Sequence, residues 1–307
     1  MNRRQLLYLL GASTGAALLP RSTGAVPSAA PAPGSPFVYC LNMATIRGHK
    51  LGFLGELEVA SRAGFRSVEI WMDTLQAYLK GGGTLAEARR RMSDLGITAE
   101  NAIGFAEWIV DDEDRRRKGI DQLKREMEQL AAIGCKRTAA PPMGATQQPG
   151  LSLAKAAERY RAILELGRQT GVTPHLELWG FSQNLGRLSE VLYVAVESGH
   201  PDARVVLDIY HLYKGGSSVE TLPLVRPQAV DILHMNDYTK NTAPATITDA
   251  DRIFPGEGVA PTRRVLEALR SPERPLILSV EVFNKEYYAQ QAGKVAATAL
   301  ARLKQVT

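Results

Sequence analysis

The chain has 307 residues, of which 45% are hydrophobic and 22% are charged, and its formal net charge is +5. This length and composition are typical of a globular chain with a full hydrophobic core. They exclude a disordered chain, a collagen-like repeat and a bundle of membrane helices. A single (β/α)8 barrel of about 250 residues fits within this length.

Residues 1–30 have the pattern of a leader that precedes the fold. Arg3 and Arg4 stand before an apolar stretch at 6–19, and a segment rich in Pro, Ala, Ser and Gly follows at 20–35. This order is typical of a secretory signal, and the Arg-Arg-x-Leu-Leu form resembles a twin-arginine signal. A transmembrane anchor is the alternative, but the stretch is short and is interrupted by Gly and Ser. We therefore expect export to the periplasm by the twin-arginine route, cleavage near residues 25–30, and no stable membrane span afterwards.

The leader also carries much of the basic charge. Arg3, Arg4 and Arg21 are its three cations and no acid precedes residue 25, so the net charge of +5 becomes about +2 after cleavage. A charge this small does not indicate a nucleic-acid surface, and we expect no nucleic-acid partner. The sequence leaves the oligomeric state open.

Beyond residue 36, strand-like and helical segments alternate along the chain. The expected strands are 37–42, 67–71, 98–103, 136–140, 173–179, 204–210, 230–235 and 276–283. The expected helices are 54–63, 85–95, 114–133, 154–170, 188–197, 262–269 and 286–304, with a weaker one at 217–225 that prolines interrupt. Four helices are followed by a residue that tolerates positive φ, namely Gly64, Gly96, Gly134 and Gly171.

This alternation, repeated about every 30 residues, predicts parallel βαβ units. We expect one domain over 36–305 that forms a single closed (β/α)8 barrel, with an open doubly wound sheet as the second choice. No Gly-x-Gly-x-x-Gly follows the first strand, so a dinucleotide-binding fold has little support. The longest loop, 237–261, follows the seventh strand and should lie over the barrel mouth, where long loops are often functional.

The two cysteines, Cys40 and Cys135, fall in the first strand and close to the fourth. An exported protein can form a disulfide. These two strands are not neighbours in an eight-stranded barrel, so we expect two buried thiols instead.

Four late strands carry a polar residue near their carboxyl end, namely Glu177, Asp208, His234 and Glu281. Side chains alternate along a strand, and helices cover the outside of a barrel, so this polar phase should point inward. A lone acid at a strand end is commonly a cap or part of a salt bridge. Four such residues on four consecutive strands favour one divalent metal ion, because bare buried carboxylates would repel each other. The oxygen-rich set favours Mn2+ or Mg2+, with Co2+, Fe2+ or Zn2+ as alternatives.

Other polar and aromatic residues stand close to these four positions. His211 is either a solvated loop residue or a substrate contact, and we favour a contact because it stands three residues after Asp208. His175 is expected to be a hydrogen-bonded interior histidine. Asn236 is a further candidate for substrate contact. Sugar-stacking faces are possible at Trp71, Trp108, Trp179, Tyr210 and Phe283, although each alone is more often core packing.

On these residues, the chain over about 36–305 resembles the xylose isomerase-like barrel superfamily of sugar isomerases and epimerases. The resemblance lies in Glu on the fifth strand, Asp-x-x-His on the sixth, His on the seventh and Glu on the eighth, and in Pro-Gly-Glu-Gly at 255–258. It implies that Glu177, Asp208, His234 and Glu281 hold the metal, that the two glutamates are the catalytic acid and base, and that His211 contacts substrate. The loop between His234 and Glu281 is longer than in those epimerases, and Arg252 is only a candidate for their substrate-binding arginine.

The resulting hypothesis is a metal-dependent isomerase or epimerase that moves a proton next to the carbonyl of an unphosphorylated carbohydrate. We expect the substrate to be unphosphorylated because we expect the protein to be exported. A lyase is the close alternative, acting by β-elimination from a 3-keto-glycoside or by dehydration of a keto-inositol. A non-catalytic sugar-binding protein is a further alternative. An apurinic endonuclease is disfavoured, because those enzymes need many histidines and this chain has five.

Overall fold

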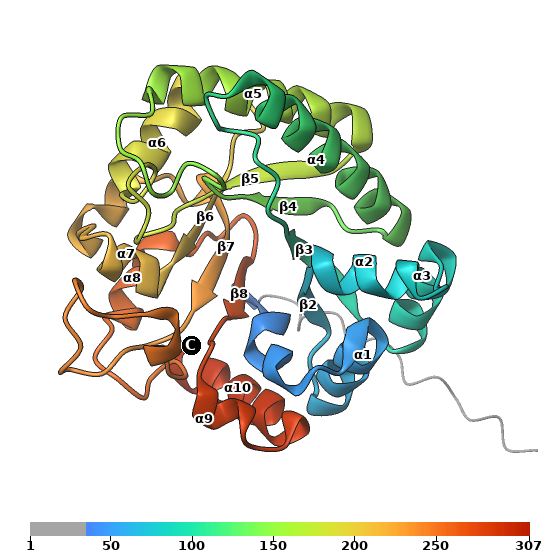
Figure 1. Ribbon diagram of the computed structural model, residues 1–307. Helices are drawn as coiled ribbons and strands as arrows, with labels where there is room; N and C mark the ends of the chain where they lie inside the picture. The colour runs from blue at the N-terminus through green and yellow to red at the C-terminus, as the bar shows by residue number, and fades with distance from the viewer. Residues whose placement is uncertain (1–34) are drawn as a thin grey trace, which may run out of the picture.

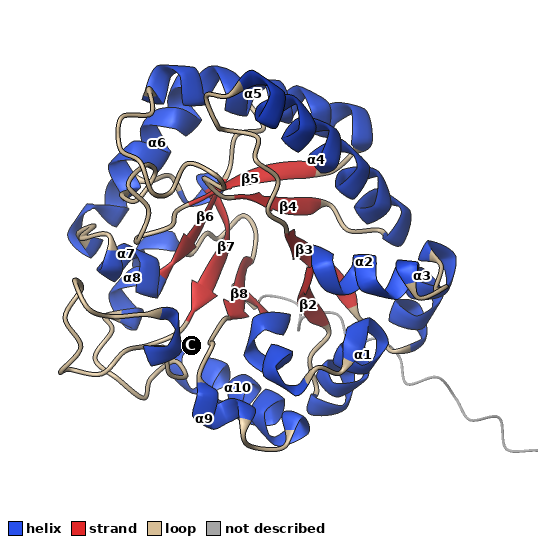
Figure 2. Cartoon of the chain, viewed as in Figure 1, coloured by secondary structure: helices blue, strands red, loops and turns tan. Residues whose placement is uncertain are grey.

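In the computed structural model, residues 35–307 are described, and they form eight parallel strands around a common axis with helices outside them (Figures 1 and 2). The strands are β1 (Phe37–Asn42), β2 (Ser67–Trp71), β3 (Thr98–Ile103), β4 (Arg137–Ala140), β5 (Thr173–Glu177), β6 (Val205–Asp208), β7 (Val230–Met235) and β8 (Leu276–Val280). The predicted (β/α)8 barrel is confirmed. The expected signal segment lies outside the described residues, so export stays a prediction.

The helices include several that the sequence did not predict. They are α1 (Gly52–Ala63), α2 (Met72–Lys80), α3 (Leu85–Asp94), α4 (Glu113–Ile133), α5 (Leu153–Thr170), α6 (Leu188–Glu197), α7 (Ile209–Lys214), α8 (Thr262–Leu269), α9 (Lys285–Tyr288) and α10 (Ala292–Val306). Short 3-10 segments are Met43–His49, Val219–Leu224, Pro227–Ala229 and Asp249–Asp251. The weak helix expected at 217–225 is thus a 3-10 turn with Pro223 inside it, and the single helix expected at 286–304 is two helices.

The strands pair in the order β3-β2-β1-β8-β7-β6-β5-β4, all in parallel. Among the described residues, no backbone ladder joins β3 to β4. Side chains link these two strands instead, because Thr138 Oγ1 donates to the carbonyl of Ala102 at 3.3 Å and Arg137 Nη1 donates to the carbonyl of Glu100 at 3.1 Å. The barrel is therefore closed at this seam by side chains.

The barrel interior is layered. An apolar layer is formed by Cys40, Val206, Ile232 and Ile277. Two residues further along the same strands, the inward positions are Asn42, Asp208, His234 and Ser279. Inward-facing side chains recur every two residues, so each of these strands contributes first to the apolar layer and then to a polar layer, as expected for a filled barrel.

The remaining packing agrees with the sequence patterns. Gly64, Gly96, Gly134 and Gly171 follow helices with φ between 63° and 98°. Cys40 and Cys135 are buried free thiols, as predicted. Across the part of the chain that is described, no helix is both long enough and apolar enough to cross a membrane.

Candidate active site

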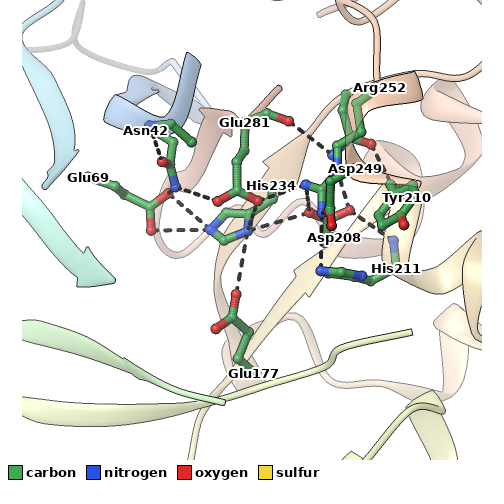
Figure 3. A network of polar contacts seen from close by, with 12 residues as sticks. Asn42, Glu69, Glu177, Asp208, Tyr210, His211, His234, Asp249, Arg252 and Glu281 are labelled. Carbon is green, nitrogen blue, oxygen red and sulfur yellow. Dashed lines mark hydrogen bonds and ion pairs between the residues drawn. The ribbon is translucent and has the colours of Figure 1, made fainter. Parts of the chain in front are cut away.

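His234 lies at the centre of the polar layer and is fully buried (Figure 3). Its Nε2 lies 3.0 Å from Glu69 Oε2, while its Nδ1 faces three other carboxylates: Glu281 Oε2 at 3.2 Å, Asp208 Oδ2 at 3.6 Å and Glu177 Oε1 at 3.9 Å. Burial disfavours charge on the imidazole, but Glu69 and Glu281 outweigh that cost and hold the pKa of His234 well above its ordinary value. His234 therefore has an acid on each side of its ring.

Asp208 ends β6 and also begins α7. Its backbone is extended (φ −142°, ψ 131°), and its Oδ1 accepts the N–H of His211 at 3.0 Å, so it is the N-cap of the helix. The spacing of three residues between Asp208 and His211 is thus the spacing from an N-cap to the third helical residue. Burial opposes ionisation of Asp208, but Arg252 overcomes it and holds the pKa of Asp208 below its ordinary value.

Arg252 reaches the site from the long loop 237–261 and is 1% exposed. Its Nη1 donates to Asp208 Oδ2 at 3.0 Å and to Glu281 Oε2 at 2.8 Å, and its Nη2 donates to Asp249 Oδ1 at 2.5 Å. The guanidinium carbon lies 4.1 Å from the centre of the Tyr210 ring. One cation is thus shared by three carboxylates inside the barrel mouth.

Glu177, the last residue of β5, is 3% exposed and has fewer polar partners than Glu281. Burial, with a smaller contribution from Glu281 and Glu69, raises the pKa of Glu177 to about 8. Its Oε2 has no hydrogen-bond partner among the described residues. Both oxygens of Glu281, in contrast, accept hydrogen bonds, from Asn42 Nδ2 at 3.0 Å and from Arg252.

These residues fit a divalent metal ion. One ligand atom each of Asp208, His234 and Glu281 lies within 4.8 Å of the others, and Glu177 stands at the edge of this cluster. Two buried polar atoms of these residues, His234 Nδ1 and Glu177 Oε2, make no hydrogen bond within residues 35–307. Buried polar atoms are rarely left without a partner. Carboxylate oxygens and an imidazole nitrogen are donors that several divalent ions accept.

A cavity of about 220 Å3 lies against this cluster, and aromatic rings form much of its wall. Its lining residues are Trp71, Ile103, Phe105, Glu177, Trp179, Phe181, His211, Asp249, Arg252, Glu281 and Phe283. The rings contact one another edge to face or at a tilt, with Trp71 and Phe105 centroids 5.4 Å apart and Trp179 and Phe181 centroids 5.2 Å apart. Such a wall suits the C–H face of a carbohydrate ring.

The loop 237–261 is held in place by the carboxylate of Asp237. This carboxylate accepts the backbone N–H groups of Gly256 at 3.1 Å, Gly258 at 3.0 Å and Ala260 at 2.8 Å. A Cβ atom on Gly258 would lie 2.2 Å from the carbonyl oxygen of Tyr238, so only glycine fits there. The Pro-Gly-Glu-Gly motif therefore wraps around an acid and fixes the loop that carries Arg252.

The structure separates the predicted substrate contacts into two groups. Trp179, His211 and Arg252 line the cavity. Asn236 stands behind Asp208: its Nδ2 donates to Asp208 Oδ1 at 3.1 Å and its Oδ1 accepts the N–H of Tyr210 at 2.9 Å. Its position favours a role in holding Asp208 rather than in contacting substrate. Trp108 is buried away from the cavity, where it donates to the carbonyl of Pro141 at 2.8 Å.

Several residues at this site were missed from the sequence. Glu69, Asn42, Asn101 and Asp249 take part in the polar network, and Phe105 and Phe181 line the cavity. Glu69 had a usable signal, because it is the one charged residue in the strand Ser67–Trp71 and shares its inward phase with Ser67 and Trp71. The loop residue Asp249 had no such signal.

Comparison with known proteins agrees with this geometry. Residues 57–306 match the profile of the xylose isomerase-like TIM barrel family. An inosose isomerase of Bacillus velezensis is 29% identical over 267 residues, which cover 85% of this chain and 93% of that relative. The crystal structure of the IolI protein with a bound zinc atom has a TM-score of 0.80 at 24% identity and covers 88% of this chain and 97% of its own. D-psicose 3-epimerase of Clostridium cellulolyticum, solved with D-tagatose, has a TM-score of 0.72 at 17% identity over 88% of this chain and 99% of its own.

Proposed function

Because this chain belongs to the xylose isomerase-like TIM barrel family, we propose that it is a sugar isomerase or epimerase that uses one divalent metal ion. The proposed substrate is an unphosphorylated cyclic polyhydroxy ketone of the inosose type. The observation that carries this proposal is the cluster of Glu177, Asp208, His234 and Glu281 against an aromatic cavity. Within the described residues, His234 Nδ1 faces three of these carboxylates without a hydrogen bond, and Glu177 Oε2 also makes none.

Asp208, His234, Glu281 and Glu177 would hold the metal, and a bound ion would supply Lewis acidity to the substrate carbonyl. The proton itself is moved by the two glutamates. Glu177 is buried and its Oε2 has no hydrogen-bond partner among the described residues, so this carboxylate is suited to accept a proton and to return it. Figure 3 shows Glu177 and Glu281 reaching toward His234 from different sides, as a pair serving two faces of one substrate requires.

In the proposed reaction, a carboxylate removes the proton from the carbon next to the carbonyl, and the electrons of that C–H bond form the enediolate. A proton then returns to carbon, from the same carboxylate or from the second one. Substrate and product have the same mass. The aromatic wall and the buried position of the carboxylates keep water away from this intermediate.

The cavity also supports a substrate without phosphate. Among its described lining residues the only lysine or arginine is Arg252, and three carboxylates already share its guanidinium. Asp249, 45% exposed, adds negative charge at the same place. A phosphate group would meet repulsion there without a free cation to bind it. The predicted export of the protein is a separate part of this proposal and agrees with an unphosphorylated substrate.

The test is to incubate the purified protein with inososes and candidate ketoses in D2O, with and without Mn2+ or Zn2+. Proton NMR and mass spectrometry then identify the products. The proposal predicts deuterium at the carbon next to the carbonyl and a new isomer that differs in mass only by that deuterium. Loss of water or release of an aglycone would instead support the lyase, and binding without exchange would support a sugar-binding protein. Exchange that is absent with every substrate and metal would contradict the proposal.

A further inference from the structure

Glu69 of β2 is a fully buried acid that the proposed reaction does not use. Its Oε2 lies 3.0 Å from His234 Nε2 and its Oε1 lies 3.3 Å from the same nitrogen. Among the described residues, no lysine or arginine lies within ion-pair distance of it. Within residues 35–307, His234 is therefore the only countercharge at this carboxylate.

Two amide groups fix the orientation of Glu69. Asn101 Nδ2 donates to its Oε1 at 2.8 Å, and Asn42 Nδ2 donates to its Oε2 at 3.1 Å. The same Asn42 nitrogen donates to Glu281 Oε1 at 3.0 Å, and Asn42 Oδ1 accepts the indole N–H of Trp71 at 2.9 Å. Both amide nitrogens are donors, so the Glu69 carboxylate acts as an acceptor toward them.

An acceptor at Nε2 determines the tautomer of the imidazole. Nε2 must carry a proton to bond with Glu69, and in the neutral ring the lone pair is then on Nδ1. Nδ1 is the atom that faces Glu281, Asp208 and Glu177 and that has no hydrogen-bond partner within residues 35–307. A histidine that binds a metal commonly donates its other N–H to a carboxylate, which fixes the ring and raises its basicity.

We propose that Glu69 is a positioning residue that accepts the Nε2–H of His234 and thereby presents Nδ1 as the metal ligand. This inference rests on the proposed function only in that the site is taken to bind a divalent ion. Asn42 extends the arrangement, because it joins Glu69 to Glu281 and to the cavity wall at Trp71. Figure 3 shows this chain of contacts from Glu69 through His234 to the three carboxylates.

The direct test is the affinity for Mn2+ of the Glu69→Gln variant, measured by electron paramagnetic resonance of free Mn2+ and independent of turnover. Glutamine keeps the size of the side chain but turns one acceptor into a donor facing other donors. The matched control is Glu126→Gln, since Glu126 is 5% exposed, lies on α4 and bonds with Gln122 outside the metal cluster. We expect Glu69→Gln to weaken Mn2+ binding by about 10- to 100-fold and Glu126→Gln to leave it unchanged.

A double-mutant cycle shows whether Glu69 acts through the histidine. In a His234→Gln background, the same Glu69→Gln change should alter the Mn2+ affinity by less than about threefold, because the ring that it orients is gone. Wild-type affinity in Glu69→Gln, or an equal loss in both backgrounds, would overturn the inference while leaving the proposed function standing. Absence of any divalent-ion binding by the wild type would overturn both.

A second measurement uses the wild-type protein, so it does not depend on whether a variant folds. Long-range 1H–15N correlation spectra of the 15N-histidine-labelled wild type with Zn2+ bound report which ring nitrogen carries a proton and which binds the metal. We expect Nε2 of His234 to keep its proton when Zn2+ is added and Nδ1 to take the chemical shift of a metal-bound nitrogen. A metal-induced shift at Nε2 instead would contradict the inference.

Discussion

Arg252 Nη1 donates to Glu281 Oε2 at 2.8 Å, in the buried centre of the barrel mouth. The same nitrogen donates to Asp208 Oδ2 at 3.0 Å. Arg252 therefore places positive charge against the two carboxylate oxygens that also lie closest to His234 Nδ1. The positive charge of the loop residue Arg252 is therefore coupled directly to the cluster of carboxylates around His234.

Replacing Arg252 with Ala should leave these buried carboxylates without a cation. Removing one partner of a buried ion pair costs about 3–5 kcal/mol. We expect a loss of that size in the free energy of unfolding without metal, and we expect Mn2+ to restore most of it because a bound ion replaces the lost charge. Thermal unfolding with EDTA and with Mn2+ measures both effects.

The control is Arg264→Ala. Arg264 forms an exposed ion pair with Glu220 in the wild type, so its loss should lower the free energy of unfolding by less than about 1 kcal/mol, with EDTA or with Mn2+. An Arg252→Ala loss that is unchanged by Mn2+ would show that the site does not accept a cation in place of the guanidinium.

The two glutamates can be tested separately from folding. Glu177→Gln and Glu281→Gln keep side-chain size but remove the ability to take up a proton. We expect each variant to lose at least about 100-fold in kcat, as removal of a general acid or base does. Full turnover by both variants on an identified substrate would contradict the assignment of the acid and base.

The aromatic wall should affect binding more than chemistry. Phe181 is 39% exposed at the cavity, beside Trp179 and His211. We expect Phe181→Ala to raise KM roughly tenfold with little change in kcat, because it removes a stacking face and no reacting group. Steady-state kinetics would reject this role if kcat fell and KM stayed constant.

The hydrogen bonds from loop 237–261 to the Asp237 carboxylate, called here the loop clamp, should contribute to the free energy of unfolding. Gly258→Ala would place a Cβ against the carbonyl of Tyr238 and the carboxylate of Asp237, and we expect a loss of about 1–3 kcal/mol in unfolding free energy. Activity should fall with it, since this loop carries Arg252. Gly293→Ala is the matched control, because nothing lies within 4 Å of a Cβ built there, in helix α10. Equal denaturation midpoints for the two variants would be evidence against the clamp.

Glu56 of α1 gives a pH dependence that is separate from the active site. It is 4% exposed, and burial raises its pKa to about 7, although Arg47 opposes this. Its folded-state pKa is above the unfolded value of 4.5, so between about pH 4.5 and 7 the folded state holds a proton that the unfolded state has lost. Stability from this group is therefore fully present below pH 4.5 and is lost as the pH rises through 7.

Glu56→Gln removes that loss. The full shift corresponds to about 3 kcal/mol, so the variant should be more stable than the wild type at pH 8 by up to that amount and nearly equal to it at pH 4.5. Urea denaturation of both proteins across this pH range measures the difference. A difference that does not change with pH would rule out the titration of Glu56 as its cause.

Much of the barrel was predictable, because strand phase and helix spacing are local. The bounds of β1, β2, β3 and β7 match the expected strands. The sixth strand was expected to run to residue 210, but it ends at Asp208, because that side chain caps α7 and turns the chain into a helix. Helix α2 was missed, since it begins directly after β2 without a capping side chain.

Site residues could be predicted where they lie on or next to a strand, because alternation along the strand shows which side chains point inward. The inward phase of β5 to β7, and of the residue that follows β8, places Glu177, Asp208, His234 and Glu281 close together. The position of Arg252 could not be predicted, because it depends on how Asp237 folds a long loop onto the barrel. The contacts of Asn236 could not be predicted either, because its partners Asp208, Tyr210 and Glu281 belong to other parts of the chain.

Metal stoichiometry tests the central claim most directly. The metal-free protein is titrated with Mn2+ by calorimetry, alongside the Asp208→Asn variant. We expect one Mn2+ ion per wild-type chain and much weaker binding by Asp208→Asn. A wild-type chain that binds neither Mn2+ nor, in a parallel titration, Zn2+ would contradict the proposed metal site.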